Sequence, residues 1–151
     1  MQSPDELATR IRAQGMKVTP QRLAVIEALY GDGSHPTADI VWDRVRERMP
    51  TVSLRTVYQA LNDLVELGEV QMVELGNGAA RFDPNLDQHD HFVCHNCERV
   101  YDVKSTRPRL VSSFAAANDG DSDDGSDGDA VQYTVDSAEV IFRGLCPACG
   151  G

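Results

Sequence analysis

The sequence predicts an α+β fold in which a helical unit is followed by a smaller unit that is rich in strands. Apolar residues recur at helical spacing as far as residue 67, and the pattern then changes to short strand-like runs. Two Cys-x-x-Cys pairs in the second half of the chain indicate that a metal ion holds its strands together. The predicted units are residues 1–83 and 84–151.

The first two helices are predicted from apolar spacing and from end signals. Leu7 and Ile11 mark a short amphipathic helix that ends near Gly15. The second helix begins at Thr19-Pro20, because Thr is a good N-cap and Pro suits the first helical position. It continues through Leu23, Ile26 and Tyr30 and stops at residues 31–33.

The third and fourth helices have clear starts as well. Thr37 opens the third, which ends at Met49-Pro50, and its inward-facing residues are expected to be Ile40, Val41 and Val45. Ser53 caps the fourth helix and Gly68 ends it. The apolar residues of the fourth helix share one face, and they are Val57, Leu61, Leu64 and Val65.

A β-hairpin is predicted directly after the helices. Its strands are residues 70–73 and 80–82, and the turn between them is Gly76-Asn77-Gly78. Short helices followed by a hairpin give the outline of a winged helix-turn-helix.

The second unit is expected to contain further strands. Residues 92–94 and 100–103 flank the first cysteine pair, and a β-rich run extends from 131 to 145. A helix is predicted for 110–117. Residues 118–129 consist of Asp, Gly and Ser with one Asn, and we expect a disordered acidic loop there because they can bury almost no apolar surface.

All four cysteines lie in two pairs, Cys94/Cys97 and Cys146/Cys149. A two-residue spacer lets both thiolates of a pair face one ion, and two pairs complete a closed tetrahedral site for structural Zn²⁺. The alternatives are two disulfides or a redox pair like that of thioredoxin. A reducing compartment favours zinc over both.

A second constellation consists of His89 and His91, which would face the same side of a strand. Asp83 precedes them and Asp102 lies on the next predicted strand. Such nitrogen and oxygen ligands suit Fe²⁺ or Mn²⁺. Two surface histidines in a polar loop are the alternative, and spacing alone does not connect His35 to this group. His95 is expected to be a solvated loop residue.

Bulk properties narrow the class of protein without fixing it. The 151 residues carry a net charge of −10, but six of the 24 acidic residues lie within 118–129, so that a local basic face is still possible. We find no signal peptide and no apolar run that could span a bilayer. A cytoplasmic protein with no membrane partner is therefore expected.

Five motifs in register resemble the ferric uptake regulator (Fur) family. They are residues 18–22 (VTPQR), 35–38 (HPTA) and 53–58 (SLRTVY), His89-Asp90-His91 followed by the first Cys-x-x-Cys, and the terminal Cys-x-x-Cys. The resemblance covers nearly the whole chain except the acidic insert. It implies a homodimeric, metal-dependent repressor, not an enzyme, with an N-terminal winged helix that binds double-stranded operator DNA and a C-terminal α/β dimerisation domain.

Within the family the sequence is most similar to the peroxide-sensing branch, including actinobacterial catalase-gene repressors. This resemblance implies a regulatory Fe²⁺ or Mn²⁺ site formed by His35, Asp83, His89, His91 and Asp102. Iron-uptake members of the family usually have Glu where this chain has Asp102. An iron-responsive uptake repressor is nevertheless the alternative to a peroxide-sensing repressor. No histidine follows His95, so we predict that a third metal site found in many members is absent. A calcium loop at 119–130 is disfavoured, because Asp124 and Ala130 replace the required Gly and Glu.

The fourth helix is expected to enter the major groove of DNA. Its outward-facing candidates for DNA contacts are Arg55, Thr56, Tyr58, Gln59 and Asn62. Lys17 and Arg22 are candidate phosphate contacts. Two other classes of protein compete with this interpretation, a thiol oxidoreductase using Cys94 and Cys97 and a zinc-ribbon interaction module. The first lacks a partner base, and the Thr-Val-Tyr helix with its wing argues against the second.

Overall fold

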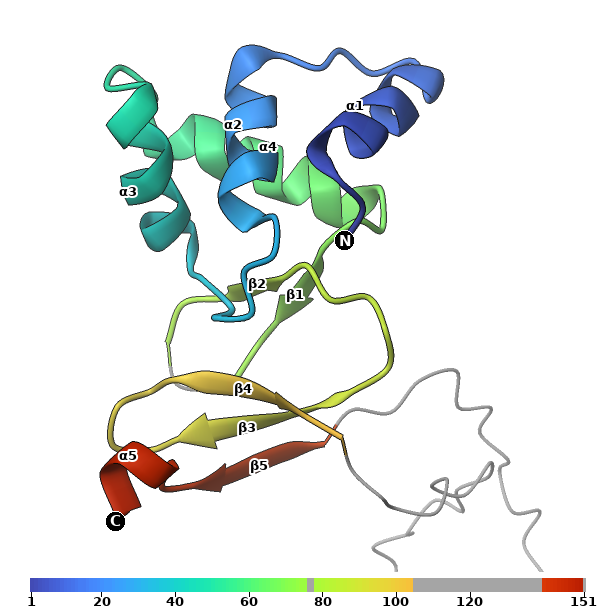
Figure 1. Cartoon of the computed structure of the whole chain (residues 1–151). Coiled ribbons are helices and arrows are strands. Elements are labelled where there is room, and N and C mark those ends of the chain that lie inside the picture. Colours follow the sequence, from blue (N-terminus) through green and yellow to red (C-terminus); the bar gives the residue numbers. More distant parts are fainter. Residues whose placement is uncertain (76–77, 105–139, 151) are drawn as a thin grey trace, which may run out of the picture.

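Helices fill the first half of the chain and strands the second (Figure 1). The computed structural model describes residues 1–75, 78–104 and 140–150. Its elements, in chain order, are α1 (Pro4–Ala13), α2 (Pro20–Leu29), α3 (Ala38–Arg48), α4 (Leu54–Glu66), β1 (Gln71–Val73), β2 (Arg81–Asp83), β3 (Asp90–Cys94), β4 (Val100–Val103), β5 (Ile141–Gly144) and α5 (Pro147–Gly150). The helix predicted at 110–117, the acidic loop predicted at 118–129 and the region where a third metal site is predicted to be absent lie outside the described residues.

Each of the first four helices begins at a hydroxyl N-cap. The side chains of Thr19, Thr37 and Ser53 each accept a hydrogen bond from the backbone N–H three residues ahead, as predicted. Ser3 forms a capping box with Glu6, so α1 begins earlier than its apolar residues indicate. A cap of this kind stabilises a helix by about 1 kcal/mol.

The four helices pack around one hydrophobic core. Val41 and Val45 of α3 are buried as predicted, but Ile40 is 41% exposed, so its predicted inward orientation is wrong. The continuation of α2 through Tyr30 is also wrong. That helix ends at Leu29, and Tyr30 has an extended backbone and is 51% exposed.

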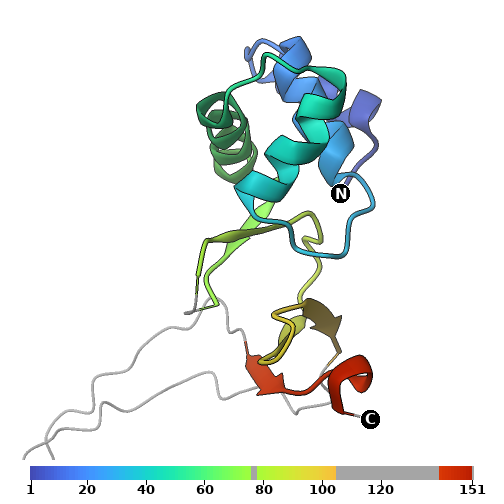
Figure 2. The ribbon, with the colours of Figure 1, turned by 90° about the vertical axis from the view of Figure 1, so that its left-hand side faces the viewer.

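Strands β1 and β2 form the predicted antiparallel hairpin, with Met72 opposite Phe82. Figure 2 shows this hairpin between the helices and the second sheet. Phe82 belongs to the core of the helices, whereas Val73 and Leu75 pack with residues of the second sheet. The hairpin therefore connects both cores, and the boundary at residue 83 stays a prediction.

The second sheet has the order β4-β3-β5. Strand β3 pairs antiparallel with β4 and parallel with β5, and this parallel pairing joins two segments far apart in the sequence. Phe92 aligns with Tyr101 on one side and Phe142 on the other, which forms an aromatic row across the sheet. His91 aligns with Asp102, so these two residues share the opposite face. No helix in the described parts of the chain is long and apolar enough to cross a membrane.

Candidate metal centres

The four cysteines converge at the end of the second sheet and form what we call the four-cysteine site. Cys94 ends β3, and Cys146 follows β5, so the parallel pairing brings the two Cys-x-x-Cys pairs together. Their sulfur atoms lie within 4.8 Å of one another, and Cys97 Sγ is 3.8 Å from Cys146 Sγ. All four are free thiols, and a disulfide would need about 2.05 Å. A tetrahedral zinc site with bonds of about 2.3 Å has edges of about 3.8 Å, so the residues fit Zn²⁺.

The thiols of the four-cysteine site differ in how readily they ionise. The backbone N–H of Cys146 donates to Cys94 Sγ at 3.4 Å and is the main reason that the pKa of Cys94 falls to about 6. The backbone N–H of Arg99 acts in the same direction on Cys97, but burial and the other thiols outweigh it and raise the pKa of Cys97 to about 11. Four thiolates therefore need a cation to exist side by side, and Zn²⁺ would provide it.

The backbone places His35 against the strands although it precedes α3. His35 has a φ of 53°, in the left-handed region, where a residue followed by proline is rarely found. The backbone N–H of Phe82 donates to the Pro36 carbonyl at 3.0 Å, and Arg81 Nη1 donates to the His35 carbonyl at 3.2 Å. Strand β2 thus holds this loop and aims the His35 ring at the second sheet.

The five ligands that the resemblance implies do meet in space, and we call this group the histidine–aspartate site. The Nε2 atom of His91 lies 3.0 Å from that of His89 and 3.1 Å from that of His35. Asp102 Oδ1 is 2.8 Å from His35 Nε2, and Asp83 Oδ2 is 3.0 Å from His89 Nε2. Ligands about 2.1 Å from an ion and at right angles to each other would lie about 3.0 Å apart.

The Nδ1 atoms of two histidines, which point away from the centre of the site, make contacts that determine which ring nitrogen carries the proton. His35 Nδ1 lies 3.1 Å from the Gly33 carbonyl and His89 Nδ1 lies 2.6 Å from the Asp87 carbonyl. A carbonyl only accepts, so Nδ1 carries the proton and Nε2 of the neutral ring presents a lone pair to the centre. Asp83 Oδ2 is buried there with no hydrogen bond. Converging lone pairs and an orphaned carboxylate oxygen fit a divalent cation.

The protonation states of the site also favour a metal over a proton. Burial lowers the pKa of His35, despite the opposing charges of Asp83 and Asp102. Burial would raise the pKa of Asp83, but its interactions with His91 and with the backbone N–H of Asn85 outweigh this effect and lower it. His35 is therefore a neutral imidazole and Asp83 a carboxylate near neutral pH, which are the forms that bind Fe²⁺ or Mn²⁺.

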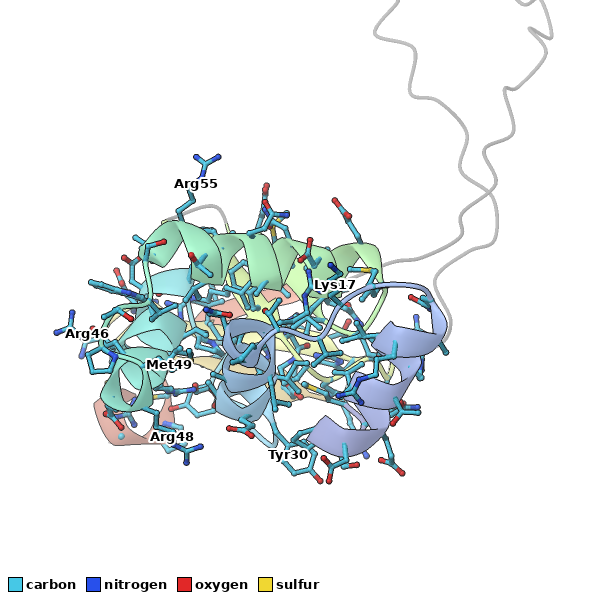
Figure 3. The ribbon with its side chains drawn as sticks, turned by 90° about the horizontal axis from the view of Figure 1, so that it is seen from above. Lys17, Tyr30, Arg46, Arg48, Met49 and Arg55 are labelled. Atoms are coloured by element: carbon cyan, nitrogen blue, oxygen red, sulfur yellow. The ribbon has the colours of Figure 1, made fainter. Side chains whose placement is uncertain are left out.

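The predicted DNA contacts lie mostly on the surface of the helical unit. In α4, four are exposed (Arg55, Tyr58, Gln59 and Asn62), and Thr56 is half-buried. Figure 3 shows Arg55 projecting away from α4 and Lys17 in the loop between α1 and α2. Arg22 is less available, because its guanidinium group forms an ion pair with Asp63 and also donates to the Lys17 carbonyl.

Three residues that organise these sites were not anticipated from the sequence. Asp63 interrupts the apolar face of α4, and that interruption was the only signal for its ion pair with Arg22. Asn85 contacts both carboxylates of the histidine–aspartate site, and only its turn-forming neighbourhood hinted at a role. Arg81 bonds to the carbonyls of His35 and Glu98, for which the sequence has no signal.

The chain matches a known protein family. The model of the ferric uptake regulator family matches residues 13–118. The chain belongs to the Fur family. This family comprises metal-responsive transcriptional regulators, and the resemblance of the five motifs is thereby confirmed.

Relatives named PerR and relatives named FurA match the chain at similar sequence identity. Transcriptional regulator FurA of Mycobacterium tuberculosis is 32% identical over 152 residues, which cover 99% of this chain and 93% of that protein. Peroxide-responsive repressor PerR of Staphylococcus epidermidis is 33% identical over 98 residues, 65% of each chain. The chain thus spans about two thirds of the length of this PerR and nearly all of FurA.

Solved structures confirm the mixed helix-and-sheet Fur fold. The ferric uptake regulator of Helicobacter pylori, described with three functional metal binding sites, matches with a TM-score of 0.69 at 18% identity and covers 97% of this chain and 91% of that one. The Campylobacter jejuni peroxide stress regulator matches with a TM-score of 0.51 at 30% identity, over 69% of this chain and 73% of that one. The predicted zinc and iron or manganese sites agree with this placement.

Proposed function

We propose that this chain is a peroxide-responsive, metal-dependent repressor that binds palindromic operator DNA as a homodimer. The observation that carries the proposal is the histidine–aspartate site, in which five ligand atoms lie within 4.8 Å of one another. They come from the loop before α3, from β2, from the residue just before β3, and from β3 and β4 of the second sheet. One ion there would tie the helical part of each chain to its sheet.

We propose a separate role for each part of the chain. Residues 1–83 are a winged-helix DNA-binding domain, and residues 84–151 are a metal-binding dimerisation domain. The four-cysteine site braces the end of the second sheet with Zn²⁺. The half-exposed aromatic row containing Tyr101 is an apolar surface of the kind that a partner subunit covers. A bacterial repressor of this kind works in the cytoplasm, with no membrane partner.

Contact with DNA is proposed through the exposed side of α4. Arg55 and Gln59 can donate to base edges in the major groove, and Tyr58 can pack on thymine methyl groups. Lys17 can neutralise a backbone phosphate. Because Arg22 is engaged with Asp63, we propose that it orders the helices more than it binds phosphate.

Metal occupancy is proposed to set the spacing of the two DNA-binding domains. In a dimer that binds a palindrome, this spacing must match the distance between half-sites. Without the ion, the lone pair of His35 Nε2 faces the Asp102 carboxylate at 2.8 Å, and this repulsion would favour separation of the loop from the sheet. The metal would therefore shift a population of conformations toward the DNA-binding one.

Peroxide sensing is proposed to follow from the ligands themselves. When bound, Fe²⁺ would supply the electron that cleaves hydrogen peroxide into hydroxide and a strong oxidant. His35 and His91 are 0% and 2% exposed, so their rings would be attacked before the oxidant reaches solvent. An oxidised imidazole is a poor ligand, and loss of the ion would release the operator. Mn²⁺ should support DNA binding without this sensitivity.

The test is operator binding with Fe²⁺ and with Mn²⁺, each with and without peroxide. We expect peroxide to abolish binding only for the Fe²⁺ form, with added oxygen on a histidine peptide by mass spectrometry. Oxidation confined to cysteine or methionine would contradict the proposal.

An iron-responsive uptake repressor is the second candidate. It is favoured by the coverage of nearly the whole chain by FurA at 32% identity. Operator binding that requires Fe²⁺ but is unaffected by modest peroxide would identify this function instead.

A further inference from the structure

Asn85 lies between the two carboxylates of the histidine–aspartate site. Its side-chain Nδ2 donates to Asp102 Oδ2 at 2.7 Å, and its backbone N–H donates to Asp83 Oδ1 at 2.8 Å. The oxygens that face the histidines are the other two, Asp102 Oδ1 and Asp83 Oδ2. A single residue therefore engages the outer oxygen of both acids.

The orientation of the Asn85 amide is fixed by its second contact. Its Oδ1 accepts from the Asp87 backbone N–H at 3.2 Å, so a flipped amide would place an oxygen against the Asp102 carboxylate and an NH₂ group against an N–H. The Asp87 carbonyl in turn accepts from His89 Nδ1 at 2.6 Å. Gln71 Nε2 donates to the Asn85 carbonyl and attaches this loop to β1. Asn85 thus contacts the ligands Asp83 and Asp102 directly and is connected to a third ligand, His89, through Asp87.

The two acids differ in how much they need this support. The Asp83 side chain is 1% exposed and is confined by its surroundings. The Asp102 side chain is 34% exposed and can rotate toward solvent. The bond from Asn85 Nδ2 thus engages one Asp102 oxygen and leaves only the other to face the histidines.

We propose that Asn85 is a positioning residue that restricts each carboxylate to one oxygen and so limits the site to five donor atoms. Carboxylates bind cations through one or both oxygens, and a strong hydrogen bond to one oxygen favours the one-oxygen mode. An ion that prefers six ligands would then have room for one small exogenous molecule, such as water or peroxide. This inference rests on the proposed function, because it needs an ion in the histidine–aspartate site.

The test compares the zinc-loaded wild type with Asn85→Ala, Asn85→Ser and Gln88→Ala. Gln88 is an exposed amide residue in the same loop and is the matched control. Serine can still accept from the Asp87 N–H in a turn but is too short to reach Asp102. Mn²⁺ affinity is measured by calorimetry, and the geometry at the ion by the electron paramagnetic resonance spectrum of bound Mn²⁺.

We expect Gln88→Ala to match the wild type in both measurements. Both Asn85 variants should lose about tenfold or more in Mn²⁺ affinity and should change the Mn²⁺ spectrum. Wild-type behaviour of Asn85→Ser would mean that the residue only shapes the turn, and it would overturn the inference. A loss of affinity with an unchanged spectrum would overturn it as well.

Measurements of zinc content and thermal unfolding establish that each variant is folded. If Asn85→Ala does not fold, the wild type is compared with Asn85→Ser alone. A wild type that binds no Mn²⁺ would overturn both the proposed function and the inference. A wild type that binds Mn²⁺ with all variants equal to it would overturn the inference alone.

Discussion

Asp102 Oδ1 lies 2.8 Å from His35 Nε2, and this contact joins β4 of the second sheet to the loop that leads into α3. His35 is fully buried, whereas the Asp102 side chain is 34% exposed. The pair therefore forms the edge of the histidine–aspartate site that opens to solvent, and it connects the two halves of the molecule. Both the connection and the packing that supports it can be tested by substitution.

Replacing His35 with alanine should abolish metal binding at the histidine–aspartate site and leave the four-cysteine site intact. Loss of a ligand should lower Mn²⁺ affinity by at least about tenfold, because loss of an outer-shell partner already costs that much. Calorimetry measures the affinity, and elemental analysis should still find one zinc per chain. His95→Ala, which alters an exposed histidine outside the site, should retain wild-type affinity.

Replacing Arg81 with methionine should weaken Mn²⁺ binding without touching a ligand. Arg81 donates to the carbonyls of His35 and Glu98, each at 3.2 Å, so it links the loop before α3 to the residue that follows Cys97. Without it, His35 is less firmly held in its left-handed conformation, and we expect a loss of about fivefold in affinity.

The matched control for Arg81 is Arg143→Met. Arg143 also donates to a backbone carbonyl, that of Leu75, which is not a metal-site residue. An equal loss of affinity in both variants would show that general packing, and not the link to His35, is responsible.

The four-cysteine site should fail as a unit when one ligand is removed. Cys97→Ser replaces a thiolate with a hydroxyl that does not ionise near neutral pH, so zinc content should fall well below one per chain. Because the site joins the ends of β3 and β5, thermal unfolding should begin at a lower temperature. Retention of zinc with an unchanged unfolding temperature would argue that the Cys97 thiol is dispensable.

Stability without a metal in the histidine–aspartate site should fall as the pH decreases below about 6.5. Burial lowers the pKa of His35 below its value in the unfolded chain. In the window just under 6.5 the unfolded chain therefore binds more protons than the folded one, and acid favours unfolding. Asp83, whose pKa is also lowered, adds to this loss only below its ordinary value of 3.8.

Urea denaturation of the zinc-loaded protein at several pH values above about 5 measures this slope. His35→Asn should flatten it, whereas His95→Asn should retain it. A slope that persists unchanged in His35→Asn would assign the dependence to another group.

Removal of Asp63 should destabilise the helical unit strongly. Asp63 and Arg22 join α4 to α2, and their side chains are only 11% and 16% exposed. Breaking such a pair leaves an uncompensated buried charge, so Asp63→Ala should lower the free energy of unfolding by about 3 kcal/mol. Asp43→Ala removes the exposed pair with Arg46 and should change it by less than about 1 kcal/mol. Urea denaturation measures both changes, and comparable losses of unfolding free energy in Asp63→Ala and Asp43→Ala would contradict this distinction.

Features set by short stretches of sequence were predictable. Hydroxyl caps at Thr19, Thr37 and Ser53 marked the helix starts, because a cap bonds within its own first turn. The four-cysteine site was predictable because each pair of thiols is prearranged by a two-residue spacer. The remaining ligand set came from the family resemblance, since spacing alone did not include His35.

Only the tertiary structure decided the contacts between distant segments. His35 meets Asp102 because β2 holds the loop before α3, and the cysteine pairs meet because β5 lies parallel to β3. The roles of Arg81 and Asn85 depend on carbonyl and carboxylate oxygens whose positions no local pattern encodes. The sequence alone determined which groups can bind metal. The fold determined which oxygen or nitrogen of each group faces the ion, because long-range packing fixes those directions.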